Sequence, residues 1–392
     1  RRKAAQLGVP QSSLIDVLAG LMATRIGVCV AGTHGKSTTA ALIAWVLRRA
    51  GLSPSAFVGA GLCGCDRGGW AGAGDLFVVE SCEYQRNFLQ FRPKHAVILG
   101  IEPDHFGTYP DEATLQEAFA QFAANVRADG TLLIPADCPR SAAAAQSATA
   151  DVLTFGVTLV SPLQAAIDAG REPNFIGSLK AGRQLTVSHG DELLTEVEMP
   201  LCGRHNAQNV LAAIAMCRCL GVPAEAVREA VATFPGIRRR FEMLGEWRGA
   251  TIIGDYAHHP TAVRVTLEAA RERYPGRRLW CVFQPHQFER TRRLFVDFAG
   301  ALSLADVPLI APVFAAREHA DANDAAELSR NLAATVKEAG GRGWFISSLD
   351  RIHPTLQDEA RPGDVVLLMG AGDIERIADE FAGRISRDHA DR

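Results

Sequence analysis

Short apolar runs alternate with helical patterns along most of this chain, and this alternation limits the possible folds more than any other feature. Buried strands are expected at "IGVCVAG", "DLFVVE", "HAVILGI", "TLLIP" and "DVLTFG". Helical patterns at "KSTTAALIAWVLRRAG" and "DEATLQEAFAQFAANV" lie between some of them. Because parallel strands need crossover connections, strands that alternate with helices predict a parallel sheet covered on both faces.

Residues 184–200, "QLTVSHGDELLTEVEMP", depart from this rhythm. Apolar and polar residues alternate there around a His-Gly-Asp turn, which predicts an antiparallel hairpin attached to the main sheet. Two helices are expected next, at "HNAQNVLAAIAMCRCLG" and "PAEAVREAVATF". A fresh series of strands follows, near 251–254, 278–284, 307–314, 343–347 and 364–369. It predicts a second α/β unit of about 150 residues, a typical domain size.

Bulk composition excludes several classes of protein. A chain of 392 residues predicts at least two domains, and its net charge of -3 gives no reason to expect nucleic acid or an anionic membrane as a partner. No apolar run approaches the ~18 residues that a membrane span needs. The nine cysteines are dilute and odd in number, which favours free thiols in a reducing cytoplasm. The chain begins with Arg1 rather than Met, so we expect an upstream segment.

The segment "VCVAGTHGKSTTAALIAWVL" is typical of a shortened phosphate-binding loop. Val30 stands where the long loop has its first glycine, and the nearest glycine is Gly32. Glycines let backbone N–H groups approach phosphate, and the following helix adds positive potential at its N-terminus. Lys36 then reaches the terminal phosphates, and the Ser37 hydroxyl can ligate Mg²⁺. The alternative is an ordinary strand–turn–helix with a surface lysine.

Acidic residues end two further strands. Glu80 closes "FVVE", and Glu102, Asp104 and His105 follow the strand in "GIEPDHFGTYP". Ligands bind at the carboxyl ends of parallel strands, so these groups and the loop together favour Mg²⁺ held between protein and phosphate oxygens. The alternative is that Asp104 closes a turn and His105 satisfies backbone groups.

The second half of the chain offers a basic and imidazole-rich set. "PGIRRRF" places three arginines at the domain junction, where one guanidinium either binds phosphate or lies in a solvated turn. Asp255 ends a strand in "GDYAHHPTAV", and His286, Arg290 and Arg292 follow another in "FQPHQFERTRRL". A zinc site is not expected, because neither the H-x-x-x-H spacing nor cysteine partners occur.

Taken together, these segments resemble the Mur ligases, the ATP-dependent enzymes that assemble peptidoglycan precursors. The short G-T-x-G-K-[ST]-[ST]-T loop is similar to theirs, and "VVESCEYQ", "IEPDHFGTY" and "GRHNAQNVLAA" resemble further family motifs in order and spacing. "RRRFEMLGE", "DYAHHPT", "FQPHQFERTR" and "GAGDI" complete a resemblance that covers nearly the whole chain.

The resemblance implies an acid–amino-acid ligase that uses ATP and Mg²⁺. "DYAHHPT" and "FQPHQFERTR" favour the branch that joins L-alanine to the lactyl carboxylate of UDP-N-acetylmuramate through an acyl phosphate. The branch that recycles a murein tripeptide onto the same sugar nucleotide shares "AHHPTA" and is the main alternative. A ligase of the same fold that joins glutamate to folate, or a peptide to the sugar nucleotide, is a further possibility. So is a nucleotide-binding relative without catalysis.

The resemblance also implies a domain plan within the α/β class. Residues 26–242 would form a central P-loop-type ATPase domain with a mostly parallel sheet. Residues 243–392 would form a Rossmann-like α/β C-terminal domain that binds the amino acid and closes on ATP. Residues 1–25 would be the linker from an N-terminal UDP-binding domain that this chain lacks.

Family roles carry over to the matching positions. The residues expected to bind ATP are Gly32, Thr33, His34, Gly35, Lys36, Ser37, Thr38, Asn206, Asn209, Arg240 and Asp255. Among them, Asn209 would contact adenine with His205 and Asn206 beside it, Arg240 phosphate, and Asp255 the ribose. The expected metal ligands are Ser37, Glu80 and His105. The expected catalytic residues are Lys36, Glu80, His105, Arg240, His259 and Arg290; His286 and Arg292 would face the same amino-acid and acyl-phosphate region.

Three positions depart from the family pattern. The usual E-A-D-E-S is E-S-C-E-Y here, so that Cys82 replaces an acid and Glu83 remains. Gln287 stands where arginine is common, and Ser37 replaces threonine but keeps the hydroxyl.

Overall fold

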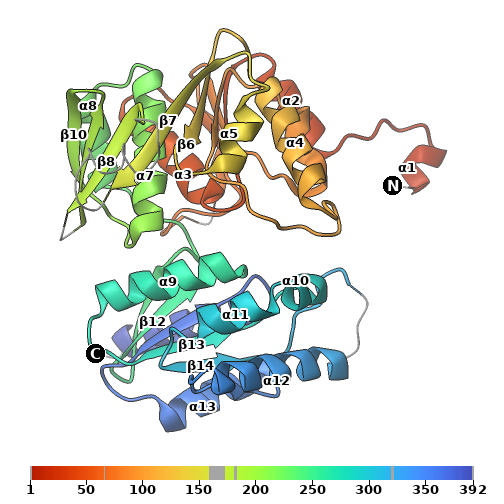
Figure 1. Ribbon diagram of the computed structural model, residues 1–392, viewed down its shortest axis with the longest axis vertical. Helices are drawn as coiled ribbons and strands as arrows, with labels where there is room; N and C mark the ends of the chain where they lie inside the picture. Colours follow the sequence, from red (N-terminus) through yellow and green to blue (C-terminus); the bar gives the residue numbers. More distant parts are fainter. Residues whose placement is uncertain (1, 66, 159–172, 181–182, 319–321, 391–392) are drawn as a thin grey trace. The chain divides into compact units, whose positions relative to one another are not determined.

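The computed structural model describes residues 2–65, 67–158, 173–180, 183–318 and 322–390 (Figure 1). They divide into two compact units, one of residues 1–200 and 206–235 and the other of residues 201–205 and 236–392. Arg1, part of the expected linker, lies outside the described residues.

The elements of the first unit follow in chain order, and α7 begins with two residues of the second unit. They are α1 (Arg2–Gln6), α2 (Leu14–Met22), β1 (Ile26–Ala31), α3 (Lys36–Arg49), β2 (Ser55–Phe57), β3 (Gly69–Trp70), β4 (Leu76–Glu80), η1 (Tyr84–Gln90), β5 (His95–Ile98), α4 (Glu112–Ala124), β6 (Thr131–Pro135), α5 (Pro139–Ala145), β7 (Asp151–Thr158), β8 (Phe175–Lys180), β9 (Gln184–His189), β10 (Glu192–Glu198), α7 (Arg204–Cys219) and α8 (Ala224–Ala232).

The described strands of the first unit form one ten-stranded sheet in the order β10-β9-β8-β7-β6-β5-β1-β4-β2-β3. From β8 to β2 in this order, every pair of neighbouring strands is parallel. At one end of the sheet, the hairpin of β9 and β10 joins β8 in antiparallel pairing, and at the other end β3 pairs antiparallel with β2. Strand β1 therefore lies between β4 and β5, and the chain leaves the carboxyl ends of all three at one edge.

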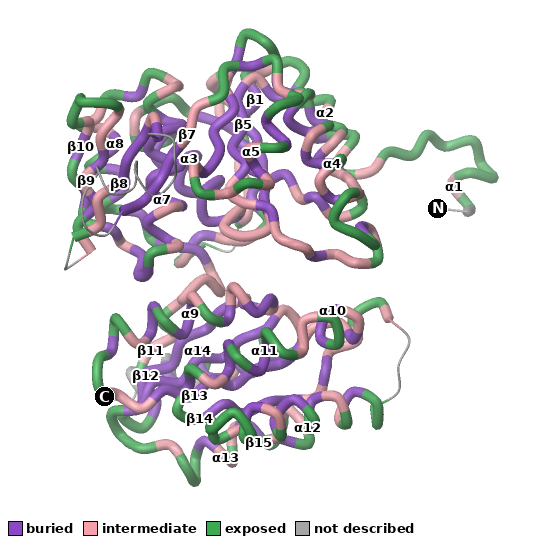
Figure 2. Tube along the Cα trace, viewed as in Figure 1, coloured by how far each residue is buried: buried purple, intermediate pink, exposed green. Residues whose placement is uncertain are grey.

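The sheet of the first unit is covered by helices because its central strands are apolar on both faces. Alternate residues such as Cys29, Phe77 and Ile98 belong to a core with α2, α4 and α5 (Figure 2). Helix α3 contacts β1, β2 and β4, and α4 and α5 lie side by side (Figure 1). Helix α3 is buried on most of its circumference, and it packs against β1, the strand that precedes it.

The second unit is a doubly wound α/β fold. Its elements are β11 (Glu242–Trp247), β12 (Ala250–Asp255), α9 (Pro260–Arg273), β13 (Leu279–Phe283), α10 (Phe288–Arg293), α11 (Phe295–Leu302), β14 (Val307–Ile310), α12 (Ala322–Glu338), β15 (Trp344–Phe345), η3 (Leu349–Arg351), α13 (Ile352–Glu359), β16 (Val365–Met369) and α14 (Ile374–Ala390).

Its six described strands have the order β11-β12-β16-β13-β14-β15, parallel except for the edge strand β11. One core joins the sheet to α9, α11 and α12, and a second core joins the other face to α13 and α14. The two faces of each central strand are therefore both buried, as the continuous apolar runs of the sequence predict.

The predicted α/β fold class, with a mostly parallel sheet followed by a Rossmann-like unit, is confirmed. So is the hairpin, formed by β9 and β10. The sequence reasoning did not find β2, β3 and β8, of which β2 has three residues and β3 two. Nor did it find β11, which begins at Glu242 although the second unit already includes the chain from Gly236. The roles assigned to residues 1–25, 26–242 and 243–392, as linker, ATP-binding domain and C-terminal domain, stay predictions.

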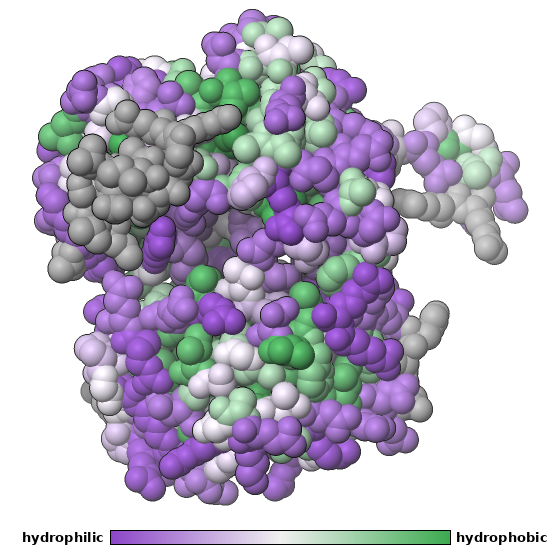
Figure 3. Space-filling view, in the orientation of Figure 1, coloured by the Kyte–Doolittle hydropathy of each residue, from purple (hydrophilic) through white to green (hydrophobic). Residues whose placement is uncertain are grey.

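In the described part of the chain, no helix combines the length and apolar character needed to cross a bilayer. Figure 3 shows polar and apolar residues mixed on the viewed face of each unit.

Candidate active site

Three strands bring the predicted phosphate loop and both acidic segments to one edge of the first sheet. Strand β1 pairs in parallel with β4, so that Val30 lies opposite Glu80. It also pairs in parallel with β5, which places Ala31 opposite Ile98. The loop after β1, the segment after Glu80 and the segment that leads to His105 therefore leave the sheet side by side, at the edge where parallel α/β sheets bind ligands.

The loop needs glycine at two positions for steric reasons. Gly32 has φ 122°, and a Cβ there would lie 2.9 Å from the backbone nitrogen of Leu99. Gly35 has φ 80° and stands directly before α3. The loop thus passes close to the β5 edge and delivers the N-terminus of α3, with its unpaired N–H groups, to the site. Such a loop can cradle an anion.

Lys36 is folded over this loop and held by three partners. Its Nζ donates to the carbonyl oxygens of Gly32 at 2.6 Å and Thr33 at 3.2 Å. The same ammonium lies 3.1 Å and 2.9 Å from the two carboxylate oxygens of Glu83. Burial alone would lower the pKa of Lys36, but the Glu83 carboxylate raises it above its usual value. Lys36 is therefore a charged group in a nearly dry site, and Glu83 neutralises it.

Glu83 is the functional candidate that sequence reasoning did not place in the site. Its side chain is 2% exposed, and its Oε1 lies 3.6 Å from Nε2 of His105 as well as near Lys36. Tyr109 donates a 2.6 Å hydrogen bond to the Glu83 carbonyl and anchors its backbone. The sequence does contain a signal for Glu83: this acid lies three residues beyond the strand end at Glu80.

The chain turns sharply after Glu83. Gln85 and Arg86 have φ 54° and 57°, in the left-handed region that non-glycine residues rarely adopt. His105, the imidazole beside Glu83, also has a positive φ of 51°. Backbone strain of this kind costs of order 1–3 kcal/mol per residue and tends to gather at functional sites.

Glu80 and Cys82 differ from Glu83 in what they contact. Glu80 accepts a 2.7 Å hydrogen bond from the backbone N–H of Gly59, which leaves further lone pairs on its carboxylate. Burial and the neighbouring Glu83 charge raise the pKa of Cys82 to about 11, so that its thiol is protonated at neutral pH. Cys82 therefore does not supply the negative charge of the acid it replaces.

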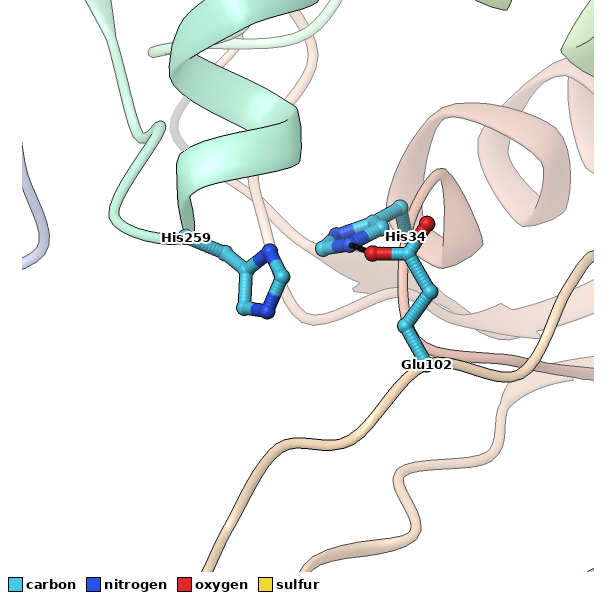
Figure 4. Close-up of side chains that lie close together, drawn as sticks. All are labelled: His34, Glu102 and His259. Carbon is cyan, nitrogen blue, oxygen red and sulfur yellow. Dashed lines mark hydrogen bonds and ion pairs between the residues drawn. The ribbon is translucent and has the colours of Figure 1, made fainter. Parts of the chain in front are cut away.

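Thr33 and His34 connect the loop to the segment after β5. The Thr33 hydroxyl donates to the Glu102 carbonyl at 3.0 Å and accepts from the Glu102 N–H at 2.8 Å. The His34 ring points toward Glu102, with 3.2 Å between Nε2 and the carboxylate Oε2 (Figure 4). These contacts fix the loop to the neighbouring strand end. Glu102, which the sequence analysis grouped with Asp104 and His105 near a metal, thus contacts Thr33 and His34 in this structure.

Asn206 and Asn209 lie beneath the loop. Both are buried, and Asn209 donates to Oδ1 of Asn206 at 3.2 Å while its own Oδ1 accepts from the Thr39 hydroxyl at 3.4 Å. Ser37 and Thr38, the first residues after Lys36 in α3, are buried as well. The structure thus brings the predicted loop, Glu80, His105 and the two asparagines together in the first unit.

Asp255 lies at the carboxyl end of β12 in the second unit. Its Oδ2 accepts from the N–H of Phe241 and its Oδ1 from the N–H of Ala257, both at 2.7 Å. Burial raises the pKa of Asp255, against the opposing effect of the Arg240 charge. In this structure the carboxylate fixes two backbone turns; its predicted contact with ribose stays a prediction.

Arg239 and Arg240 of the "RRRF" segment both lie over the ring of Tyr256, with guanidinium carbons 4.8 Å and 4.9 Å from its centroid. Arg239 also donates to the Gly370 carbonyl at 2.7 Å and pairs with Glu375 at 2.8 Å. Stacking of this kind holds a guanidinium plane in place while its edge keeps donors. The predicted arginine that binds phosphate, Arg240, is therefore held at the same strand edge as Asp255.

His286 and Arg290 form a pair on the same edge of the second sheet. Nη1 of Arg290 lies 3.1 Å from both Nδ1 and the carbonyl oxygen of His286, and the arginine is 2% exposed. His259 instead caps α9, where its Nδ1 accepts from the N–H of Thr261. Arg292 lies over the ring of Phe288 and is exposed. Arg290 is thus a buried partner of His286, and the roles of these residues toward an amino acid stay predictions.

The first unit therefore combines a glycine loop of the kind that can cradle an anion, a charged lysine, three carboxylates and two imidazoles at one sheet edge. The second unit presents arginines, histidines and an aspartate at the corresponding edge of its own sheet. Such groups can neutralise a polyphosphate and stabilise the charge that develops in phosphoryl transfer.

Comparison with known families agrees with this chemistry. Residues 30–217 match the Mur ligase middle domain, and residues 239–372 match the Mur ligase glutamate ligase domain. Among curated relatives, UDP-N-acetylmuramate–L-alanine ligase of Desulfitobacterium hafniense (strain Y51) is 38% identical over 96% of this chain and 81% of its own length. The enzyme of that name from Sorangium cellulosum (strain So ce56) is also 38% identical, over 98% of this chain and 80% of its own length.

Solved structures give the same result. The UDP-N-acetylmuramate-alanine ligase of Thermotoga maritima has a TM-score of 0.78 and 25% identity, covering 99% of this chain and 82% of that one. A murein peptide ligase of Psychrobacter arcticus shares the fold, with a TM-score of 0.67 and 24% identity over 97% of this chain and 82% of that one. With the matched family domains and these relatives, the chain belongs to the Mur ligase family of ATP-dependent ligases.

Proposed function

We propose that this chain joins L-alanine to the lactyl carboxylate of UDP-N-acetylmuramate, with ATP as the energy source. The observation that carries the proposal is the phosphate loop at the β1 edge, with Lys36 poised over it beside Glu83. The near full-length similarity to curated L-alanine ligases favours L-alanine over the murein tripeptide as the amino substrate.

The reaction begins with transfer of the γ-phosphoryl group of ATP to the lactyl carboxylate, which gives an acyl phosphate and ADP. The backbone N–H groups of the loop and the Lys36 ammonium stabilise negative charge on the transferring group. The amine of L-alanine then attacks the acyl carbon, the amide forms, and phosphate leaves. The amine loses a proton in this step; His286, held by Arg290, and His259 are the imidazoles that we propose for the amino-acid region.

The donors at the first site suit Mg²⁺. Carboxylate and hydroxyl oxygens are its preferred protein ligands, and Glu80 keeps free lone pairs beyond its bond to Gly59. We propose that Ser37, Glu80 and His105 hold the ion, either directly or through water. When bound, Mg²⁺ supplies positive charge that neutralises phosphate oxygens.

The adenine and ribose contacts remain those implied by family membership, Asn209 and Asp255. Because Asn209 already supports the loop through Thr39, adenine binding and loop position are coupled in this proposal. We place the reaction in the cytoplasm, because the nine cysteines are dilute and odd in number, which fits a reducing compartment.

A phosphate-release assay tests the proposal. The chain, and in parallel the chain fused behind the N-terminal domain of a curated relative, is mixed with ATP, Mg²⁺ and UDP-N-acetylmuramate. Phosphate release that depends on added L-alanine is the expected result. Release with L-Ala-γ-D-Glu-meso-diaminopimelate instead of L-alanine would identify a recycling ligase. ATP binding without release on either amine would contradict ligase activity.

A further inference from the structure

We propose that Glu83 is a positioning residue that holds the Lys36 ammonium until nucleotide binds, and then transfers its contact from Lys36 to His105. This inference rests on the proposed function, because it assumes that phosphate is the ligand of the loop.

The first argument is competition for one cation. Both carboxylate oxygens of Glu83 lie within 3.1 Å of the Lys36 ammonium, the group expected to contact the terminal phosphates. The carboxylate and a phosphate cannot both sit against that ammonium at full contact, because two anions in a nearly dry site repel each other. Nucleotide binding therefore has to displace Glu83 from Lys36.

The second argument is that a destination exists within reach. Oε1 of Glu83 lies 3.6 Å from Nε2 of His105, and the carbonyl of Glu83 is fixed by Tyr109. A rotation of the side chain about this fixed backbone moves the carboxylate from the lysine toward the imidazole. A buried carboxylate that loses its ammonium partner is costly unless another donor is within reach, and the His105 imidazole is such a donor when its Nε2 carries the proton.

The third argument is the shape of the segment that presents Glu83. The chain kinks shortly after Glu83, where Gln85 and Arg86 adopt left-handed backbone angles. Backbone strain of this kind tends to gather at functional sites. Glu83 therefore keeps Lys36 folded over the loop in the free protein and sets how tightly phosphate must bind.

Calorimetric titration with Mg²⁺-free ADP tests this on the whole chain. In Glu83→Gln the competing charge is removed, and we expect ADP to bind about tenfold more tightly than to the parent, the equivalent of about one modest ion pair. Glu83→Gln also removes the carboxylate partner of His105, so we expect kcat in the ligase assay to fall. We expect KM for ATP to fall as well, because the nucleotide binds more tightly. A residue with only a structural part would give unchanged or weaker ADP binding.

Two controls separate competition from general charge and from misfolding. Glu112→Gln removes a charge from an exposed ion pair with Arg140 in the same unit and should leave ADP affinity unchanged. Glu83→Asp keeps the charge but shortens the reach to Lys36, so that ADP should bind between the parent and Glu83→Gln. It gives a second reading if the glutamine variant fails to fold.

A double-mutant cycle gives the decisive result. If Glu83 acts by competing for Lys36, Glu83→Gln will give no gain in ADP affinity once Lys36→Ala is present. An equal gain with and without Lys36 would overturn the inference, as would weaker ADP binding in folded Glu83→Gln. A parent chain that binds no ADP would overturn the proposed function itself, which distinguishes the two failures.

Discussion

Asn209 touches the phosphate loop at Gly35 so closely that no side chain fits between them: a Cβ on residue 35 would lie 2.2 Å from Oδ1 of Asn209. The two residues are 174 positions apart in the chain. The loop conformation is therefore supported from below by α7 as well as by its own glycines.

We expect Gly35→Ala to abolish ADP binding and to destabilise the first unit. The φ of 80° costs an alanine about 1–2 kcal/mol, and the new methyl group displaces an asparagine that is bonded to Thr39 and Asn206. Thermal unfolding and ADP titration measure both effects. Adding Asn209→Ala should recover only the part of the stability that is lost to the clash. Full recovery of stability would show that the backbone angle is not strained.

Lys36→Ala should lower phosphate release by at least about a hundredfold, because it removes a charge that stabilises the transferring phosphoryl group. It should also lower the free energy of unfolding by about 3 kcal/mol, because Glu83 stays buried without its main cation. Urea unfolding of Lys36→Ala and of Lys36→Ala with Glu83→Gln separates the two effects. The second change should restore stability but not turnover, and turnover near that of the parent in either variant would refute the loop assignment.

His95 should make the protein less stable in mild acid. Burial, with a smaller effect of the Lys94 charge, lowers the pKa of His95 from 6.5 to about 4 in the folded chain. Between these two values the unfolded state binds more protons, so the free energy of unfolding falls as the pH is lowered from 6.5 to 4, by about 3 kcal/mol in total.

Urea unfolding at several pH values between 7 and 4 measures this slope. In His95→Gln the slope should be flatter over that range, although the variant is less stable at pH 7. An identical slope in the parent and the variant would assign the acid sensitivity to other groups.

Asp255→Asn should destabilise the second unit by about 2 kcal/mol. The carboxylate accepts one backbone N–H on each oxygen, whereas an amide offers one acceptor and turns its NH₂ toward the other N–H. Thermal unfolding measures the loss. Asp358→Asn, an exposed change at the end of α13, is the matched control and should stay within about 0.5 kcal/mol of the parent. Equal stability of the two variants would mean that these hydrogen bonds contribute little.

Much of the fold could be predicted from the sequence because its signals are local. The apolar run of β1, the glycines of the loop and the helical pattern from Lys36 lie within one short segment, and the structure places a strand, a loop and a helix there. The short strands β2 and β3 escaped prediction because two or three residues carry no measurable period.

The amino-acid sequence alone determined the α/β class, the glycine loop between β1 and α3 and the membership of the family. The tertiary structure decided which groups meet there: Glu83 reaches Lys36 across 47 positions of sequence, and Glu102 reaches Thr33 across 69. These partners depend on the order β4-β1-β5 in the sheet, which no local pattern contains. Periodicity predicts that a strand exists; only its neighbours in the folded sheet determine which side chain faces the lysine.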